Sequence, residues 1–309
     1  MFLSVIIPCF NEELVVEESY NRLSAVMKKN NYDYEFLFIN DGSKDRTFEI
    51  LTSISQTDNR VKIINFSRNF GHQNAVTAGI NHCNGDYAVI IDSDLQDPPE
   101  VIEDMLIIMQ QEDANVVYGV RKRRKGESFF KLFTAKWFYR TLNKLSDVKF
   151  PVDTGDFRLI DRKVIETFNN LPEKNKYIRG LISWVGYKQC PCYYERDERF
   201  AGETKYPLKK MLKFALTGLL YFSKKPLQIA TYIGFASILT GLLYALIILI
   251  KFLFTDAIFV TGWTTTIFLI IFFGGVQLLT IGILGQYIGS LFDEAKNRPE
   301  YIIKDKVNL

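Results

Sequence analysis

Two long stretches without a single charged residue dominate the last third of this chain. The first is PLQIATYIGFASILTGLLYALIILI, from Pro226 to Ile250, and the second is AIFVTGWTTTIFLIIFFGGVQLLTIGILGQYIGSLF, from Ala257 to Phe292. A helix of about 20 apolar residues crosses the roughly 30 Å hydrocarbon core of a bilayer, and both stretches are longer than that. Two buried core helices are the alternative, but a soluble domain of this size has little room for such runs. The sequence therefore predicts two transmembrane helices, at about 227–250 and 260–288.

Basic residues lie on the outer flanks of the two predicted spans. Lys296 and Arg298 follow the second span, and the connection between the spans holds only Lys251 and Asp256. The lysines before the first span are Lys209, Lys210, Lys213, Lys224 and Lys225. Positively charged flanks stay on the cytoplasmic side, so we expect a multi-pass protein of the cell membrane with both termini in the cytoplasm.

The N-terminal part is expected to remain in the cytoplasm as well. The opening MFLSVIIPCF has no basic n-region and meets Asn11 and Glu12 too soon for a signal peptide. We therefore expect a cytoplasmic domain over 1–207, a juxtamembrane amphipathic helix over 208–225, a membrane region over 226–292 and a cytoplasmic tail over 293–309.

The distribution of charge and cysteine excludes several classes of protein. The net charge is only +3, but RKRRK at Arg121–Lys125 and the lysines before the first span form basic clusters. Such clusters close to a membrane suit anionic head groups or a phosphorylated ligand better than nucleic acid. The segment from Phe129 to Tyr139 mixes aromatic and basic residues, which fits an interfacial helix or a helix packed on the domain. The four cysteines have neither zinc spacing nor a C-x-x-C pair.

Up to about Gln111 the chain alternates between short apolar runs and longer amphipathic runs. LSVIIP precedes EELVVEESYNRLSAVMKK, YEFLFIN precedes DRTFEILTSISQT, VKIINF precedes GHQNAVTAGINHC, and YAVIID precedes PPEVIEDMLIIMQQ. This alternation predicts βαβ units, a mostly parallel sheet and helices on both of its faces. Ligands of such sheets bind outside the carboxyl ends of the strands. Polar residues follow each apolar run at that point: Asn11 and Glu12, Asn40 and Asp41, Ser67 and Arg68, and Asp92 and Asp94.

The stretch DSDLQDPP holds the most informative acids. Asp92 and Asp94 are separated by one residue just past a strand, so their carboxylates can share a divalent cation with substrate phosphates. Gln96 is a possible third ligand. The alternative is a helix N-terminus with acids in its first turn. For Asp97, a favourable place at such a helix N-terminus is the only role that the sequence suggests. No G-x-G-x-x-G follows the first strand and no G-x-x-x-x-G-K-[ST] occurs, so a bound nucleotide has to be held by other means.

Several motifs together resemble one family. VIIPCFNEE, FINDGSKDRT, SRNFGHQNA, DSDLQDPPE, DTGDFRLIDRKV and ERFAGETKYPLKKML occur in this order, followed by the paired apolar stretches. They resemble the family 2 glycosyltransferases of GT-A fold, and within them the polyprenyl-phosphate glycosyltransferases, the bactoprenol glucosyltransferase group related to dolichol-phosphate mannose synthase. The resemblance implies an α/β fold with a GT-A nucleotide-sugar-binding domain, followed by amphipathic and transmembrane helices.

The resemblance also implies roles for individual residues. For the nucleotide-sugar these are Pro8, Glu12, Asp41, Ser43, Arg68 and Asp92. For Mg²⁺ or Mn²⁺ they are Asp92, Asp94 and Gln96. For the lipid phosphate they are Arg121, Arg158, Arg199 and Lys205. Asp156 is the expected catalytic carboxylate, with Asp153 as the second choice, and His72 is expected near the nucleotide or the sugar.

The expected reaction is an inverting, metal-dependent transfer of a hexose from a UDP-sugar to polyprenyl phosphate at the bilayer, giving a lipid-linked monosaccharide. Glucose is the first choice of sugar, with N-acetylglucosamine or another UDP- or GDP-sugar as alternatives. The glycine-containing second span favours a homo-oligomer. A processive polysaccharide synthase, a D-x-D phosphatase and a non-catalytic membrane-anchored nucleotide binder are the rival functions. The first lacks its Q-x-x-R-W motif here, and the second lacks D-x-D-G-[TS] because Leu95 follows Asp94.

Overall fold

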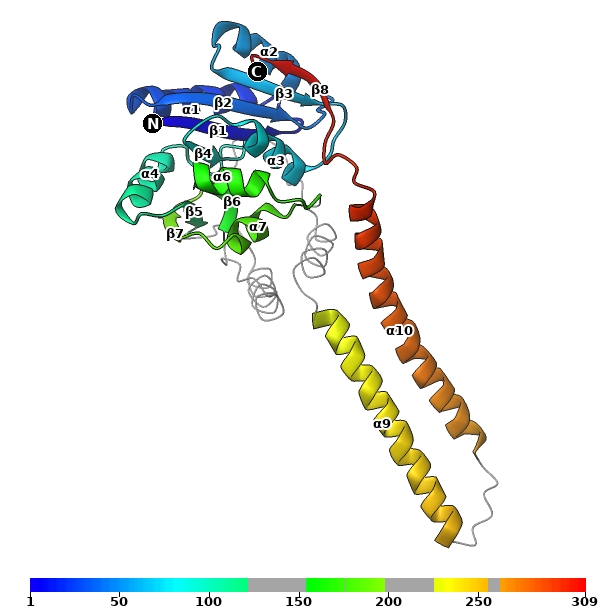
Figure 1. Cartoon of the computed structure of the whole chain (residues 1–309). Coiled ribbons are helices and arrows are strands. Elements are labelled where there is room, and N and C mark those ends of the chain that lie inside the picture. Colours follow the sequence, from blue (N-terminus) through cyan, green and yellow to red (C-terminus); the bar gives the residue numbers. More distant parts are fainter. Residues whose placement is uncertain (122–153, 175, 198–224, 255–261) are drawn as a thin grey trace. The chain divides into compact units, whose positions relative to one another are not determined.

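The computed structural model describes residues 1–121, 154–174, 176–197, 225–254 and 262–309 (Figure 1). They belong to two units, one that carries a β-sheet and one that consists of two long helices. Three predicted site residues, Asp153, Arg199 and Lys205, lie outside the described residues. The predicted interfacial helix at Phe129–Tyr139 and almost all of the juxtamembrane segment 208–225 lie outside them as well.

Four parallel strands form the centre of the sheet. They are β1 (Phe2–Cys9), β2 (Asp33–Asn40), β3 (Val61–Phe66) and β4 (Tyr87–Ile90). β1 lies between β4 and β2, and β3 lies on the far side of β2. Every residue of β1 from Leu3 to Cys9 is buried, as expected for a strand with helices on both faces. The predicted α/β class is confirmed, and each of the four apolar runs is a strand.

The other strands make the sheet mixed. β6 (Thr154–Asp161) runs antiparallel to β4 and to β5 (Val116–Arg121), whereas β7 (Gln189–Tyr194) is parallel to β5. The full order is β7-β5-β6-β4-β1-β2-β3-β8. Antiparallel β6 brings the segment around Asp156 next to β4, and hence next to the aspartates that follow β4.

The last strand, β8 (Ile303–Val307), was not predicted. It pairs antiparallel with β3, and Arg298–Leu309 belongs to the unit of the sheet, although the sequence interpretation treated 293–309 as a tail. Asn65 donates to Asp305 at 2.8 Å, and the Tyr301 ring stacks on Phe66 with centroids 5.0 Å apart. A five-residue edge strand with three charged residues gives little hydrophobic signal, and such charges are typical of strands that must not pair with other chains.

Helices cover both faces of the sheet (Figure 1). The main core forms under α1 (Val16–Lys29), α2 (Thr47–Thr57) and α4 (Val101–Gln111). Helix α3 (His72–His82) contacts β1 and β2, and it also contacts α6 (Arg162–Asn169), which in turn contacts α7 (Ile178–Trp184). A Cβ on Gly79 would lie 2.1 Å from Ile6, so α3 approaches β1 this closely because residue 79 has no side chain.

The second unit is a pair of apolar helices, α9 (Lys225–Phe254) and α10 (Trp263–Ala295), which contact each other. Both are long and apolar enough to cross a membrane. Large apolar side chains stand exposed along them, including Phe254 at 82% and Leu278 at 71%. Water disfavours such surfaces and lipid does not, so the two helices suggest membrane association. The cytoplasmic placement of the termini stays a prediction.

A buried ion pair connects β2 with both of its neighbours, β1 and β3. Glu35 on β2 accepts hydrogen bonds from Ser4 Oγ at 2.5 Å, from Lys62 Nζ at 2.6 Å and from Asn84 N at 2.8 Å. Burial on its own raises the pKa of the Glu35 carboxyl, but Lys62, Ser4 and Asn84 together hold it below its usual 4.5. A carboxyl with a lowered folded-state pKa stabilises the fold above the unfolded-state pKa and loses that contribution as the pH falls through the folded-state pKa.

Glu35→Gln is therefore expected to cost about 2 kcal/mol of unfolding free energy near neutral pH, because hydrogen bonds to a charged group are lost in a buried site. The cost should shrink as the pH falls below 4.5. Denaturant unfolding of the detergent-solubilised full chain at about pH 7 and about pH 4 measures both quantities. Asp33→Asn, at an exposed position on the same strand, is the control. An equal loss at both pH values would show that the ionised carboxylate is not what stabilises this site.

Candidate active site

A cavity of about 700 Å³ opens where the parallel strands end. The residues after β1, β2 and β4 all reach it, which agrees with the rule for ligand sites in such sheets. Residues from β6, α3 and α7 complete it. The lining residues are Pro8, Cys9, Phe10, Asn11, Glu12, Asp41, Asn69, Gly71, His72, Ala75, Asp92, Ser93, Asp94, Asp156, Arg179 and Arg196.

On one side of the cavity, Asp41 organises the loop after β3. Its carboxylate accepts hydrogen bonds from the backbone N–H groups of Phe70 at 2.6 Å and Gly71 at 2.9 Å, and from the Asn69 side chain at 2.9 Å. Burial raises the pKa of Asp41 in spite of these donors. Gly42 has φ +64°, and a Cβ there would lie 2.3 Å from the backbone of Arg68, so only glycine fits. The two loops are therefore held together at a fixed distance.

The residues predicted for the nucleotide-sugar separate into two groups. Pro8, Glu12, Asp41 and Asp92 line the cavity. Ser43 and Arg68 are not among the lining residues. The Ser43 hydroxyl accepts from Asn11 N at 2.9 Å, and the exposed Arg68 guanidinium stacks on the Phe70 ring at 4.0 Å.

The D-x-D turn places two carboxylates at the cavity. Asp92 and Asp94 both line it, and Asp94 also accepts from the Gln96 backbone N at 3.2 Å. Leu95, between them, has φ +58°, which makes the tight turn. The Gln96 side chain is not among the lining residues.

Two further carboxylates, those of Asp94 and Asp156, lie close enough to Asp92 to affect its ionisation. Burial, together with the nearby carboxylates of Asp94 and Asp156, raises the pKa of Asp92 to about 6 against the lowering effect of His72. Among the described residues there is no group of three or more His, Cys, Asp or Glu side chains arranged to hold a metal ion. Two carboxylates are nevertheless what Mg²⁺ usually takes from a protein when phosphates and water supply the remaining ligands. Asp92 and Asp94 fit such a cation, and its charge would relieve their repulsion.

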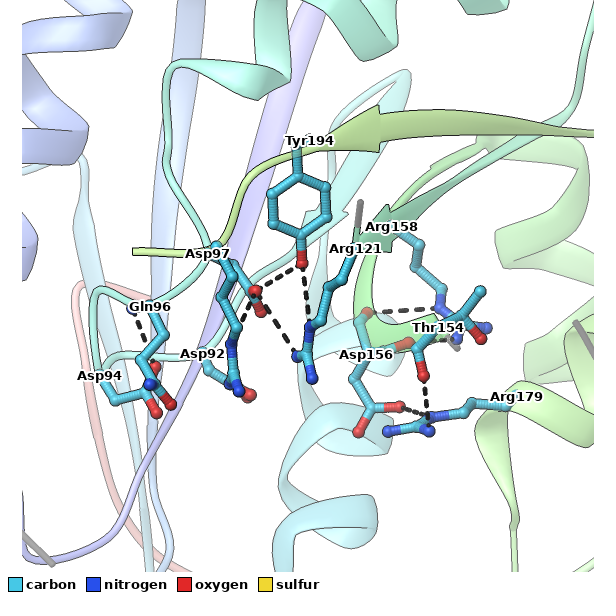
Figure 2. A network of polar contacts seen from close by, with 12 residues as sticks. Asp92, Asp94, Gln96, Asp97, Arg121, Thr154, Asp156, Arg158, Arg179 and Tyr194 are labelled. Carbon is cyan, nitrogen blue, oxygen red and sulfur yellow. Dashed lines mark hydrogen bonds and ion pairs between the residues drawn. The ribbon is translucent and has the colours of Figure 1, made fainter. Parts of the chain in front are cut away.

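Asp156 on β6 lies between two cationic side chains. It accepts from Arg179 Nε at 2.6 Å (Figure 2) and contacts His72 Nε2 at 3.1 Å. The same His72 nitrogen lies 3.7 Å from Asp92, and Arg179 also donates to the Thr154 carbonyl at 2.9 Å. A row of alternating charges therefore lines the cavity, in the order Asp92, His72, Asp156 and Arg179.

Electrostatic interactions within this row shift the pKa values of Asp156 and His72. Burial would raise the pKa of Asp156, but Arg179 and His72 hold it well below its usual range. Burial would lower the pKa of His72, but Asp92 and Asp156 raise it to about 9. Asp156 is thus ionised at neutral pH, and its charge together with that of Asp92 favours the imidazolium form of His72. Asp156 is a weak proton acceptor in this setting, which favours a positioning or electrostatic role over general-base catalysis.

Two of the arginines predicted for the lipid phosphate have other partners. Arg158 is buried, donates to the backbone carbonyls of Gly155 and Asp156, and has its pKa lowered by burial to about 10. The Arg121 guanidinium lies 3.5 Å from Asp97 and donates to the Tyr194 hydroxyl at 3.4 Å (Figure 2). Neither is among the lining residues of the cavity.

Two cationic lining residues were missed. Arg179 stands alone in the apolar helix segment YIRGLISW, and a single charge on such a helix was the available signal. Arg196 lies three positions before Arg199, and the sequence analysis had chosen Arg199 as the phosphate-binding arginine of this segment. His72 was expected near the nucleotide or the sugar, and it lines the cavity between the two acids.

Comparison with known proteins identifies the family. Residues 4–168 match the family model described as Glycosyl transferase family 2. The chain is a family 2 glycosyltransferase. It is 54% identical over 306 residues to "Uncharacterized glycosyltransferase YkcC" of Bacillus subtilis, with 99% of this chain and 94% of that protein covered.

Two further relatives of this family 2 glycosyltransferase have more specific names. "Prophage bactoprenol glucosyl transferase homolog" of Escherichia coli K12 is 41% identical over 305 residues, covering 98% of this chain and 99% of that protein. "Bactoprenol glucosyl transferase" of Shigella phage SfII is 41% identical over 305 residues, covering 98% of both chains. The similarity therefore includes the segment with the two apolar helices as well as the sheet.

The pairing of Asp156 leads to a test in this glycosyltransferase. Asp156→Asn keeps the size of the side chain but removes the negative charge that lies between Arg179 and His72. We expect turnover to fall by about 100-fold or more, with little change in the affinity for the nucleotide-sugar. Steady-state kinetics and equilibrium binding of the nucleotide measure the two effects, with Glu166→Gln, exposed on α6, as the matched control. A loss confined to nucleotide affinity would assign Asp156 to donor binding.

Proposed function

We propose that this enzyme transfers glucose from UDP-glucose to undecaprenyl phosphate at the cytoplasmic face of the cell membrane, with inversion at the anomeric carbon. The observation that carries the proposal is the 41% identity, over almost the full length, to proteins named bactoprenol glucosyl transferase. A chain that has both a sheet-bearing unit and two apolar helices suits an enzyme whose donor is water-soluble and whose acceptor is a lipid. The product is a lipid-linked monosaccharide for modification of a cell-envelope glycan.

The parts of the cavity suit the two substrates. Pro8, Glu12 and Asp41, at the ends of β1 and β2, form the proposed uridine side. Asp92 and Asp94 would hold Mg²⁺ or Mn²⁺, which when bound supplies positive charge against the departing diphosphate. Arg179 and His72 supply further positive charge on the side of Asp156.

The chemistry needs little help with proton transfer. An oxygen of the acceptor phosphate forms the new bond to the anomeric carbon, and the bond from that carbon to the diphosphate breaks, with its electron pair leaving on UDP. A phosphate monoester has a second pKa of about 6, so the acceptor is mostly dianionic at neutral pH. The need is to bring two anions together, and Asp156 with its two cationic partners positions the acceptor and the sugar for this step.

Topology and assembly belong to the proposal as well. We infer that α9 and α10 cross the membrane with both termini in the cytoplasm, from the basic flanks of the spans. In α10, a Cβ added to Gly274, Gly275, Gly282, Gly285 or Gly289 would have no atom of another described part of the chain within 4 Å. Such small-residue surfaces allow close helix packing between copies, which supports a homo-oligomer.

Transfer of label tests the proposed function directly. The full chain in detergent is incubated with a radiolabelled UDP-sugar and a short polyprenyl phosphate, and the organic phase is counted and analysed by mass spectrometry. We expect label from UDP-glucose in a product of the mass of a hexosyl phosphate lipid. Preferential transfer of N-acetylglucosamine or of a sugar from GDP would replace the proposed donor. No lipid-linked label with any nucleotide-sugar would contradict the whole proposal.

Removal of divalent cations tests the metal. EDTA should abolish transfer and added Mg²⁺ or Mn²⁺ should restore it, because the departing diphosphate otherwise lacks the positive charge of the cation. Asp92→Asn and Asp94→Asn should each lower activity by about 100-fold or more, since a removed ligand also removes the cation's hold on the diphosphate. Asp86→Asn, which lies before β4, is the control. Transfer that is indifferent to the chelator would exclude a metal role for both aspartates.

A further inference from the structure

Asp97, three residues after Asp94, is a fully buried carboxylate with an unusual set of partners. Its Oδ1 accepts from the Tyr194 hydroxyl at 2.5 Å, and it lies 3.5 Å from a guanidinium nitrogen of Arg121 (Figure 2). Arg196 Nε lies at the same distance, 3.5 Å, from that oxygen. Asp97 Oδ2 is buried and has no hydrogen-bond partner among the described residues. Neither the D-x-D turn nor a helix N-terminus accounts for this arrangement.

The charges of this cluster do not cancel. One carboxylate faces two guanidinium groups, so Asp97, Arg121 and Arg196 together carry one positive charge. A buried carboxylate is stable only when it is paired, and two arginines supply more charge than the pairing requires. Arg196 is 29% exposed and lines the cavity that also contains Asp92 and Asp94. Arg196 therefore brings one of the two guanidinium charges to the substrate site, where an anionic group of a substrate can pair with it.

Further contacts fix the position of Arg196 relative to the D-x-D turn. The backbone N of Asp197 donates to the Gln96 carbonyl at 3.0 Å, directly beside Asp97. The Arg22 side chain joins Asp197 at 3.1 Å and Glu100 at 2.8 Å. Segment 194–197 and segment 96–100 are thus connected by a backbone hydrogen bond, by Arg22 and by the Asp97 cluster.

The other arginine of the cluster lies against β6. A Cβ on Gly155 would lie 2.7 Å from Arg121 Nη2, so the guanidinium occupies the space left by that glycine. Gly155 precedes Asp156 in the chain. Asp97 consequently fixes one cation next to the strand of Asp156 and another at the cavity wall.

We propose that Arg196 is a phosphate-binding residue of the active site, and that Asp97 is the positioning residue that holds the Arg196 guanidinium there. This rests on the proposed function, in which both substrates carry phosphate: a diphosphate on the donor and a monophosphate on the acceptor. Guanidinium forms strong paired hydrogen bonds with either. Asp97 itself is fully buried and anionic, so it acts through the arginines and not on the phosphate.

Three variants of the full chain test the proposal: Arg196→Gln, Asp97→Asn and the double variant. Michaelis constants are measured separately for the nucleotide-sugar and for the polyprenyl phosphate. Arg196→Gln should raise one of them by about tenfold or more, because a charge-assisted hydrogen bond to phosphate is lost. A rise for the nucleotide-sugar assigns Arg196 to the diphosphate, and a rise for the lipid assigns it to the acceptor.

Asp97→Asn should raise the same Michaelis constant, and the double variant should be no worse than Arg196→Gln alone, since residues that act as one unit are not additive. A merely structural role of Asp97 would give additive losses or would change both constants and the turnover alike. Asp104→Asn, an exposed charge removal on α4, should leave all constants unchanged.

Other results would overturn the proposal. Unchanged constants for both substrates in Arg196→Gln would exclude phosphate binding by this residue, and additive losses would exclude positioning by Asp97. If Asp97→Asn does not fold, Tyr194→Phe removes the hydroxyl that bonds Asp97 and accepts from Arg121 but keeps the carboxylate, and an unchanged constant there would count against positioning. A wild-type chain that transfers no sugar would refute the proposed function instead, so the two failures are distinguishable.

Discussion

The parallel pairing of β1 with β2 and with β4 is the constraint on which the active site depends. Since the three strands point the same way, their carboxyl ends meet at one edge, and the residues that follow them form three sides of one cavity. Strand β6 pairs antiparallel with β4, so Asp156, near the start of β6, lies at the same edge of the sheet as the end of β4. Residues more than 140 positions apart in the sequence, such as Glu12 and Asp156, therefore line the same space.

Alternating charge is the second organising feature. Asp92, His72, Asp156 and Arg179 form one row, and Asp97 forms a second group with Arg121 and Arg196. In each case a carboxylate holds cations at fixed places in a poorly solvated site, where they require no reorganisation when an anionic substrate arrives. The acids of this site thus have two tasks. Some face the cavity as candidate cation ligands, and others position arginine and histidine.

The sequence predicted the parts of this arrangement that are local and failed for those that depend on long-range packing. The polar residues at the strand ends and the D-x-D turn followed from runs of a few residues, whereas Asp156 was expected from the resemblance of its motif to a family. Arg158 was chosen because arginine suits phosphate, but its place within β6 directs it to backbone carbonyls. The partners of Asp97 come from β5 and from the end of β7, about 25 to 100 positions away, so no spacing in the sequence could indicate them. β8 was missed because a short charged edge strand has no hydrophobic period to read.

The low pKa of Asp156 bears on how an enzyme with a phosphate acceptor differs from one with a hydroxyl acceptor. A hydroxyl must lose a proton as it attacks, which calls for a base with a pKa near the working pH. A phosphate monoester is already ionised, and an unpaired carboxylate beside it would repel it. Arg179 and His72 reduce that repulsion because they lie on either side of Asp156 and offset its negative charge. The geometry of this cavity is in that sense suited to an acceptor that arrives as an anion, and poorly suited to one that must first be deprotonated.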